Sequence, residues 1–262
     1  MNKEYFERYS RQLILPSFGK AAQDKLSAAH ILIIGMGGLG CPVAQYLVGA
    51  GVGKITIVDD DVVTLSNLHR QILFTESDIG KNKVDVAKSK LKDLNKDVLI
   101  ETIPARFDKN LGLKVIPTVD LVIDCSDNFE TRYFLDDACR LLDKPLIFGA
   151  VSKFEGQLAF FAPGHSYYRN IFPDPPSSGL IRNCSEEGIL GMLPGIIGSM
   201  QAMEAIKYIT GIGEILIDKI MTYDALHQQI LLVDVMPLTH NGPVSIEELE
   251  KTAYAIPKCI NS

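Results

Sequence analysis

HILIIGMGGLGCP, residues 30–42, joins an apolar run to a cluster of glycines and decides the fold. Gly35, Gly37 and Gly40 have the spacing G-x-G-x-x-G, and Gly38 adds a further glycine inside it. Between a strand and a helix, such glycines permit a tight turn and a close approach of the backbone to a phosphate, which the start of the helix also attracts. The stretch therefore predicts a strand, a phosphate-binding loop and a helix, in that order.

Strand-like and helix-like segments alternate on both sides of this loop up to residue 151. Strands are predicted at 30–35, 54–61, 98–103, 120–127 and 145–151, and helices at 41–51, 83–95 and 128–143. Such alternation is typical of parallel strands joined by crossover helices. We expect an α/β fold: a Rossmann-like, mostly parallel sheet with helices on both faces.

The pattern changes in the C-terminal half. The predicted elements there are an edge or antiparallel strand at 155–163, a helix at 194–211 that starts with Pro194, and a hairpin at 218–224 and 228–235. Antiparallel strands would therefore extend the sheet. Residues 163–194 lack a clear period, which is usual for functional or mobile stretches of this length. We assign 1–240 to one domain and 241–262 to a C-terminal tail, in which Ser245 would cap a short surface helix.

The composition fits a globular protein of the cytoplasm. The chain is 47% hydrophobic and 22% charged, and its net charge of −6 gives no global basic field for nucleic acid. No apolar run approaches the roughly 20 residues of a membrane helix, and the polar start lacks the core of a signal peptide. The five cysteines are dispersed without a C-x-x-C pair, which argues against a disulfide framework and a four-cysteine zinc site. We expect a cytoplasmic protein that binds neither nucleic acid nor membrane.

The glycine loop alone does not separate NAD from ATP. Asp59 lies 19 residues beyond Gly40, at the end of the second predicted strand. At that place a carboxylate accepts hydrogen bonds from a ribose in either nucleotide. Asp61, from the same acidic strand end, is a further candidate for nucleotide binding. A glycine-rich turn that binds nothing is the structural alternative, and the position of Asp59 argues against it.

Polar residues downstream favour ATP. They follow strands or start helices, and they are Asn67, Arg70, Lys83, Asp124, Asp127 and Asn128. In a doubly wound sheet all of them lie near the carboxyl ends of the strands, where ligands bind. Several cations and a carboxylate beside one phosphate loop suit a triphosphate with Mg²⁺ better than NAD. Each residue by itself could be a solvated surface charge, but their joint placement favours a site.

The chain resembles the MoeB/ThiF enzymes, bacterial relatives of the ubiquitin-activating enzymes, over about residues 5–235. The motifs that carry the resemblance are RYSRQLILP, GMGGLGCPVAQYL, AGVGKITIVDDDVVTLSNLHRQILF, DIGKNKVDVAK, DCSDNFETRYFLDDAC and GSMQAMEAIK. The resemblance implies ATP-dependent adenylation of the C-terminal Gly-Gly carboxylate of a small ubiquitin-like sulfur carrier protein. Pyrophosphate is released, and the carrier would serve thiamine, molybdopterin or related sulfur-transfer biosynthesis.

The resemblance also implies roles for individual residues. Gly38 would lie against the nucleotide and Asp59 would hold the ribose. Asn67, Arg70 and Lys83 would contact the phosphates. Asp127 would ligate Mg²⁺, next to Asn128. Arg11, in RYSRQ, matches an arginine that reaches the ATP of the neighbouring subunit, which implies a homodimer with Arg11 acting in trans.

The implied chemistry agrees with this set of residues. A carboxylate attacks the α-phosphate, and positioned cations and a metal ion stabilise the developing charge. No general base is needed, because a carboxylate is already ionised near pH 7. Three alternatives stay open: an NAD-dependent oxidoreductase, a non-catalytic scaffold that binds a carrier, and an enzyme that adenylates a peptide or small-molecule carboxylate. No evident proton-relay histidine paired with an acid supports the first.

Cys184, in RNCSEEGILG, matches a loop where some family members carry a cysteine that takes part in sulfur or thioester chemistry. It is either a thiolate nucleophile acting on the acyl-adenylate or a loop residue without chemistry. Arg182 would favour the thiolate, whereas Glu186 and Glu187 would oppose it.

Many family members hold a structural zinc with two C-x-x-C pairs. At the first position this chain has Tyr167 and Asn170, and 233–244 has no cysteine at the second. His165 and His240 supply at most two of four ligands. We expect no zinc, and we expect the aromatic cluster of Tyr167, Tyr168 and Phe172 to hold the loop and the C-terminal strands together by apolar packing.

Overall fold

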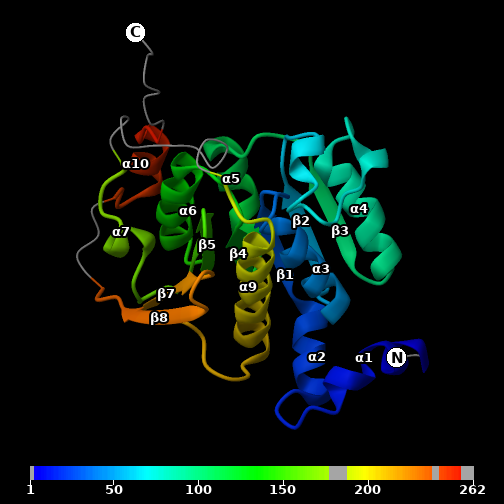
Figure 1. Cartoon of the computed structure of the whole chain (residues 1–262). Helices are drawn as coiled ribbons and strands as arrows, with labels where there is room; N and C mark the ends of the chain where they lie inside the picture. Colours follow the sequence, from blue (N-terminus) through cyan, green and yellow to red (C-terminus); the bar gives the residue numbers. More distant parts are fainter. Residues whose placement is uncertain (1–2, 177–187, 238–241, 255–262) are drawn as a thin grey trace.

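One eight-stranded sheet forms the centre of the molecule, in the order β3-β2-β1-β4-β5-β6-β7-β8 (Figure 1). The structure is a computed structural model that describes residues 3–176, 188–237 and 242–254. The strands are β1 (His30–Ile34), β2 (Lys54–Val58), β3 (Leu99–Ile103), β4 (Leu121–Asp124), β5 (Leu146–Ser152), β6 (Glu155–Phe161), β7 (Lys219–Asp224) and β8 (Gln229–Asp234). Strands β1 to β5 pair in parallel, and β5 to β8 pair antiparallel. This architecture confirms the expected fold class.

Helices cover both faces of the sheet. They are α1 (Lys3–Leu13), α2 (Gly19–Ala28), α3 (Gly40–Ala50), α4 (Lys83–Leu94), α5 (Lys109–Val115), α6 (Phe129–Leu141), α7 (Tyr168–Ile171), α9 (Met192–Thr210) and α10 (Ile246–Lys251). Along β1, Ile31 and Ile33 pack in a core with α2, α3, α4 and α9. Leu32 and Ile34 point the other way, into a core with α5, α6, α7 and α10. Successive side chains of a strand face opposite ways, so the unbroken apolar run of β1 serves two cores.

The predicted elements are present, with shifted ends. β2 and β4 are shorter than expected because they end at Val58 and Asp124. The chain beyond them carries carboxylates, which a sheet covered on both faces cannot bury without a partner. The predicted strand at 155–163 is antiparallel, as expected, but it lies inside the sheet between β5 and β7. Helix α9 begins at Met192, before Pro194.

The helices begin and end at residues whose types favour these cap positions. Asn128 Oδ1 accepts a hydrogen bond from Thr131 N (2.9 Å) at the start of α6, which is the contact that an N-cap asparagine makes. Ser245 caps α10 in the same way through Glu248 N (3.2 Å). Gly211 ends α9 with a positive φ of 76°, a conformation that glycine adopts without strain. No helix of the described segments is long and apolar enough to cross a membrane.

A buried ion pair ties the C-terminal segment to the body of the protein. Both Nε and Nη2 of Arg169, on α7, donate to the fully buried Asp137 carboxylate of α6 (2.9 Å each). Tyr254 Oη donates to the same carboxylate (2.7 Å). The Arg169 guanidinium also lies over the Tyr133 ring, 4.7 Å from its centroid. We call Asp137, Arg169 and Tyr254 the C-terminal latch, since they join α6, α7 and the segment that carries α10.

Candidate functional site

The candidate site lies where the strand order reverses, between β1 and β4. The helix after β1 belongs to one core and the helix after β4 to the other, so the chain leaves the two strands in opposite directions. Cys125 N donates to Ile34 O (2.9 Å), and Gly35 N donates to Val58 O (2.9 Å). These bonds hold the ends of β1, β2 and β4 together. Open α/β sheets bind their ligands in the crevice at such a point.

Protein contacts require glycine at two positions of the loop. Gly35 has φ +92°, and a Cβ there would lie 2.7 Å from Cys125 O. A Cβ on Gly40 would lie 2.0 Å from Gly35 O, which is impossible without a backbone shift. A Cβ on Gly37, by contrast, would meet only Gln71 Nε2, at 3.7 Å. The fold itself does not need glycine there, so the Gly37 face of the loop is available for a ligand.

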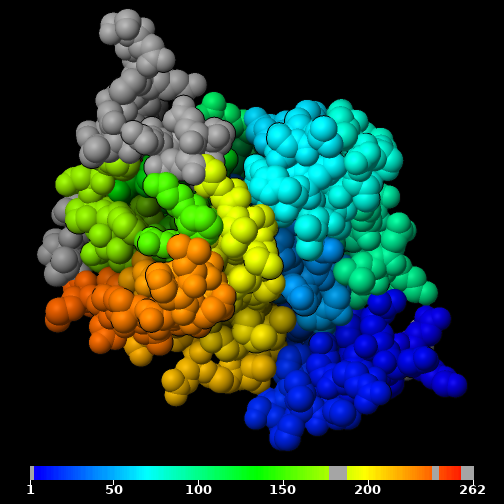
Figure 2. Space-filling model, in the orientation of Figure 1, coloured from blue at the N-terminus to red at the C-terminus, as the bar shows by residue number. Residues whose placement is uncertain are grey.

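Three distant segments meet at Gly38. A Cβ at this position would lie 2.9 Å from Pro194 of α9 and 3.6 Å from Arg70 Cγ. A Cβ on Gly191, just before α9, would lie 2.3 Å from His69 O. The segment 65–71 therefore runs along both the glycine loop and the start of α9. Figure 2 shows this contact at the surface, where the cyan segment after β2 borders the yellow helix α9.

Asp59 links the end of β2 to the glycine loop. Its Oδ2 accepts a hydrogen bond from Met36 N (2.6 Å), and its Oδ1 accepts one from Asp61 N (2.8 Å). Burial raises the pKa of Asp59, while Lys83 and the two backbone donors act in the opposite direction. Asp59, Asp60 and Asp61 lie together, and no other set of three potential metal-ligating side chains is found in the described part of the chain. Exposed acidic groups are common without an ion, so this cluster alone identifies no metal site.

The two predicted phosphate-binding cations are held by protein groups. Lys83 is only 3% exposed, and its Nζ lies 2.7 Å from Oδ2 of Asp61. Arg70 Nη1 donates to Ser66 O (3.0 Å) and lies 2.8 Å from His69 Nε2. Asn67 fixes this turn, because its carbonyl accepts hydrogen bonds from the backbone N–H groups of Arg70 and Gln71. Lys83 thus lies beside the acidic strand end and Arg70 beside the glycine loop.

The segment after β4 offers one exposed carboxylate. Asp124 is 1% exposed, burial raises its pKa, and its Oδ1 accepts from Ser126 N (2.9 Å). Asn128 uses its side-chain oxygen as the cap of α6. Asp127, between them, is exposed just beyond the end of β4. Of these three, Asp127 is the side chain placed to bind a cation from solution.

Arg11 lies at the other end of the sheet. Its neighbours on α1 bind the last turns of two helices: Gln12 Nε2 donates to Ala50 O (2.8 Å) and Arg8 Nη1 donates to Leu94 O (3.0 Å). Because α3 and α4 run antiparallel to the strands, their last turns lie at the amino ends of the strands, away from the glycine loop. Figure 1 shows α1 at the lower edge of the molecule. The exposed Arg11 is therefore not part of the site of its own chain.

The described cysteines are unsuited to nucleophilic chemistry. Burial raises the pKa of Cys41 to about 12, and it raises the pKa values of Cys125 and Cys139 well above the ordinary range. All three are buried in the cores. Cys184 and His240 lie outside the described residues.

Two glutamines at the site were not identified from the sequence. Gln201, on α9, is fully buried, and its Nε2 donates to Asp124 O (2.8 Å), which fixes the end of β4. Gln71 stands in the motif SNLHRQ and lies against Gly37. Both stand in motifs of the resemblance, SNLHRQ and GSMQAMEAIK, but the contact of Gln201 joins residues 77 positions apart, and no local pattern indicates it.

The fold and the site define a doubly wound α/β protein with a glycine-rich loop at the point where the strand order reverses. The chain belongs to the ThiF family, whose sequence pattern matches residues 9–243. It is 46% identical over 263 aligned residues to a sulfur carrier protein adenylyltransferase of Thermus thermophilus, covering 96% of this chain and 97% of that one. It is 43% identical to a SAMP-activating enzyme E1 of Haloferax volcanii, covering 84% of this chain and 82% of the relative.

A solved structure of E. coli MccB with ATP has the same fold. It superposes with a TM-score of 0.79 and 26% sequence identity, over 90% of this chain and 74% of MccB. The family match confirms the resemblance that the sequence motifs indicated.

The glycine loop yields a paired prediction. Gly40→Ala should lower the free energy of unfolding by about 3 kcal/mol or more, because its Cβ would collide with Gly35 O. Gly37→Ala should change it by less than about 1 kcal/mol, since its Cβ meets only an ordinary contact. If phosphate occupies the open face, Gly37→Ala should nevertheless weaken ATP binding.

Urea denaturation and ATP titration of both variants measure these effects. Unchanged ATP affinity in Gly37→Ala would contradict a phosphate site at this face.

Proposed function

We propose that this protein uses ATP to adenylate the C-terminal Gly-Gly carboxylate of a small ubiquitin-like sulfur carrier protein. The observation that carries the proposal is the junction of β1 and β4, where Arg70 lies against the glycine loop and the exposed Asp127 follows the end of β4. The named relative from Thermus thermophilus, similar over nearly its whole length, supports the same activity. The carrier would supply sulfur for thiamine, molybdopterin or a related product.

In the reaction, a carboxylate oxygen of the carrier bonds to the α-phosphorus while the bond to the pyrophosphate oxygen breaks. The carboxylate needs no deprotonation near pH 7, so positioned charge is the main requirement. Arg70 and Lys83 would contact phosphate oxygens. Lys83 would leave its ion pair with Asp61 and bind a phosphate oxygen instead. Asp59 would accept a hydrogen bond from the ribose. Asp127 would hold Mg²⁺, which neutralises the charge that builds up on the leaving pyrophosphate.

A peptide is the second candidate substrate. Structures of MccB contain the peptide MccA, and MccB shares the fold of this chain at lower sequence identity. The greater similarity to the sulfur carrier adenylyltransferase favours the carrier protein over a peptide.

We propose further that the protein acts as a homodimer in which the partner subunit's Arg11 completes each site. Arg11 is exposed and lies at the far end of the sheet from its own glycine loop. Large apolar side chains are exposed on the outer faces of two adjacent helices: Tyr46 of α3 and both Met192 and Met203 of α9. A second copy that covers this face would bury them, which is a typical feature of homodimer interfaces.

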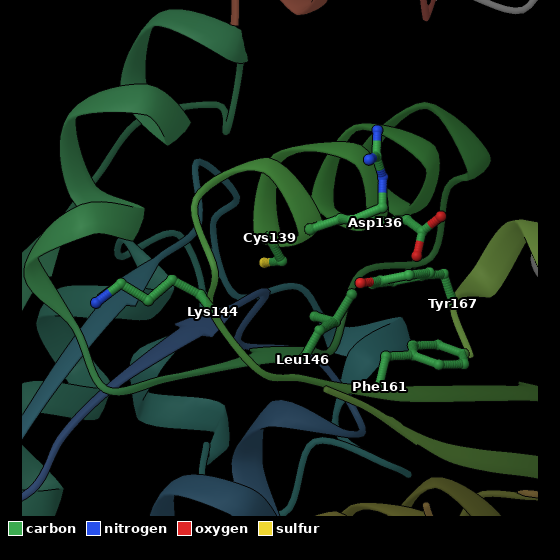
Figure 3. A pocket seen from close by; sticks show the side chains of 7 residues that line it. Asp136, Cys139, Lys144, Leu146, Phe161 and Tyr167 are labelled. Atoms are coloured by element: carbon green, nitrogen blue, oxygen red, sulfur yellow. The ribbon is translucent and has the colours of Figure 1, made fainter. Parts of the chain in front are cut away.

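We also propose that the protein holds no structural zinc and that the C-terminal latch, in place of a metal ion, joins the C-terminal segment to the body of the protein. Asn170 Oδ1 accepts a hydrogen bond from Tyr167 N (2.8 Å), and the Arg140 guanidinium lies 5.9 Å from the Tyr167 ring centroid. Tyr167, Phe161, Leu146 and Cys139 line one small pocket beside α6 (Figure 3). Both residues that stand in place of zinc cysteines thus have structural contacts of their own.

Carrier-dependent exchange of labelled pyrophosphate into ATP tests the activity. We expect exchange with a Gly-Gly carrier and none with a carrier that lacks its last two residues. Asp127→Ala should reduce exchange by about a hundredfold or more, because it removes the proposed metal ligand. Carrier binding without exchange would support a scaffold, and a cofactor absorbance change with NAD would support an oxidoreductase. Normal exchange in Asp127→Ala at saturating Mg²⁺ would contradict the assignment of this residue.

Mixing inactive subunits tests the shared site. Arg11→Ala and Asp127→Ala homodimers should each be inactive. After subunit exchange, half of the dimers would be mixed and each would hold one intact site, so activity should return to about a quarter of wild type. A lack of recovery, with mixed dimers shown by native mass spectrometry, would rule out Arg11 acting in trans.

Treatment with chelators distinguishes a C-terminal segment held by the latch from one held by a metal ion. We expect chelators to leave the melting temperature unchanged. Asp137→Ala should lower the free energy of unfolding by about 3 kcal/mol, because Arg169 would be left buried without its carboxylate. Asp24→Ala, which breaks the exposed pair with Lys20, is the control and should cost less than about 1 kcal/mol. Stoichiometric zinc whose removal unfolds the protein would refute the proposal.

A further inference from the structure

Helix α1 is attached to the rest of the subunit through one buried residue, Tyr9. Of the 11 residues of α1, which the structure describes in full, only Tyr9 is buried, with an exposed fraction of 4%. An isolated helix of this length is marginal in water, so its position depends on contacts with the body of the protein. The way in which Tyr9 is held therefore decides where the other side chains of α1 point.

The ends of α3 and α4 form a closely packed site for the Tyr9 side chain. Asn95, just after α4, is completely buried, and its Nδ2 donates to Tyr9 Oη (2.8 Å) and to Val48 O (2.9 Å). Its Oδ1 accepts from Asp97 N (3.2 Å), so both ends of the amide are satisfied. Gly51, which ends α3, lies against the ring, because a Cβ there would be 2.5 Å from Tyr9 Cζ. A larger side chain at position 51 would therefore displace Tyr9.

Two further side chains fix the rotation of α1 about its axis. Arg8 Nη1 donates to Leu94 O (3.0 Å), and Gln12 Nε2 donates to Ala50 O (2.8 Å). Arg8, Tyr9 and Gln12 lie on one face of α1, since residues three and four positions apart are neighbours on a helix. All three reach the ends of α3 and α4, so together they set both the place and the rotation of α1.

Arg11 leaves α1 in a different direction. With about 3.6 residues per turn, it lies about 200° round the helix from Tyr9, and its side chain is exposed. No partner for its guanidinium is found among the residues that the structure describes, whereas Arg8 is held by Leu94 O. The face that anchors α1 thus leaves Arg11 free to act outside its own subunit.

We propose that Tyr9 is a positioning residue for the partner subunit's site, because its contacts with Asn95 and Gly51 fix the direction in which Arg11 is presented. The proposal rests on the shared site proposed above, in which Arg11 acts in trans. Catalysis by positioned charge requires placement to within about 0.5 Å, and a shift of about 1 Å can cost about a hundredfold in rate. A buried tyrosine at the amino ends of the strands would therefore act on a reaction that takes place in the other subunit.

Two substitutions of Tyr9 separate the ring from its hydroxyl. Tyr9→Ala removes the buried anchor of α1, so the homodimer should lose carrier-dependent pyrophosphate exchange by about tenfold or more. Tyr9→Phe keeps the ring against Gly51 and loses only the bond from Asn95, so we expect a loss of about fivefold or less. Glu4→Ala, which breaks the exposed pair between Glu4 of α1 and Lys96, is the control and should leave exchange unchanged.

Mixing of subunits shows in which site Tyr9 acts. In a mixed dimer of Tyr9→Ala and Asp127→Ala, the Tyr9→Ala subunit keeps its Asp127 and is completed by the partner subunit's Arg11, which is held normally. Exchange should therefore recover to about a quarter of wild type, as expected for Arg11→Ala with Asp127→Ala. In a mixed dimer of Tyr9→Ala and Arg11→Ala, neither site receives a well-placed arginine, so exchange should not recover. A role in folding alone would not divide the variants in this way.

Three results would overturn the proposal. The first is recovery of Tyr9→Ala with Arg11→Ala and not with Asp127→Ala, which would place the effect of Tyr9 in the site of its own subunit. The second is recovery with neither variant, although native mass spectrometry shows the mixed dimers. The third is full exchange in the Tyr9→Ala homodimer.

The same measurements distinguish a failure of this proposal from a failure of the proposed function. If Arg11→Ala complements Asp127→Ala and Tyr9→Ala does not, only the positioning role of Tyr9 is refuted. If Arg11→Ala does not complement Asp127→Ala, the shared site is refuted, and the positioning role with it. A wild-type protein without carrier-dependent exchange would refute the adenylation itself.

Discussion

The rest of the site depends on the hydrogen bond from Cys125 N to Ile34 O (2.9 Å), which continues the pairing of β1 with β4 past the end of both strands. It brings the glycine loop and the Asp124–Asn128 segment to one edge of the sheet. Gly35 lies at this junction, where a Cβ would be only 2.7 Å from Cys125 O. Gln201 then fixes the same junction from α9 by binding Asp124 O. The glycine loop thus contacts the end of β4 on one side and helix α9 on the other.

The sequence predicted those parts of the fold that depend on local pattern. The strands around the loop, the caps of α6 and α10 and the antiparallel C-terminal hairpin follow from periodicity, from cap residues and from turns. The predicted ends of β2 and β4 lie too far along the chain. Acidic residues follow the apolar residues there, and the sequence pattern does not mark the residue at which the strand ends. Helix α1 was not predicted, since its position depends on contacts such as Asn95 Nδ2 to Tyr9 Oη (2.8 Å), 86 residues away.

The sequence named candidate residues for the site but gave no information on their geometry. Gly38, Asn67 and Arg70 were all named from motifs, and the structure brings Gly38 and Arg70 into contact. The ion pair between Lys83 and Asp61, however, was not foreseeable, because it joins two residues that the sequence marked separately as ligands of a nucleotide. The contacts of the latch were also not predictable from the sequence. Asp137 and Tyr254 are 117 residues apart, and neither stands in a local pattern that indicates its partner. Long-range pairing is what a single sequence does not display.

The latch and Gln71 show two opposite uses of a buried polar group. At the latch, the Asp137 carboxylate accepts from Arg169 and Tyr254, so the charge removed from water is compensated inside the protein. That arrangement makes the C-terminal segment rigid and leaves nothing for a ligand to bind. At the glycine loop, Gln71 Oε1 is buried without a hydrogen-bond partner in the part of the chain that the structure describes. The two groups therefore differ in whether the loss of their bonds to water is compensated inside the protein.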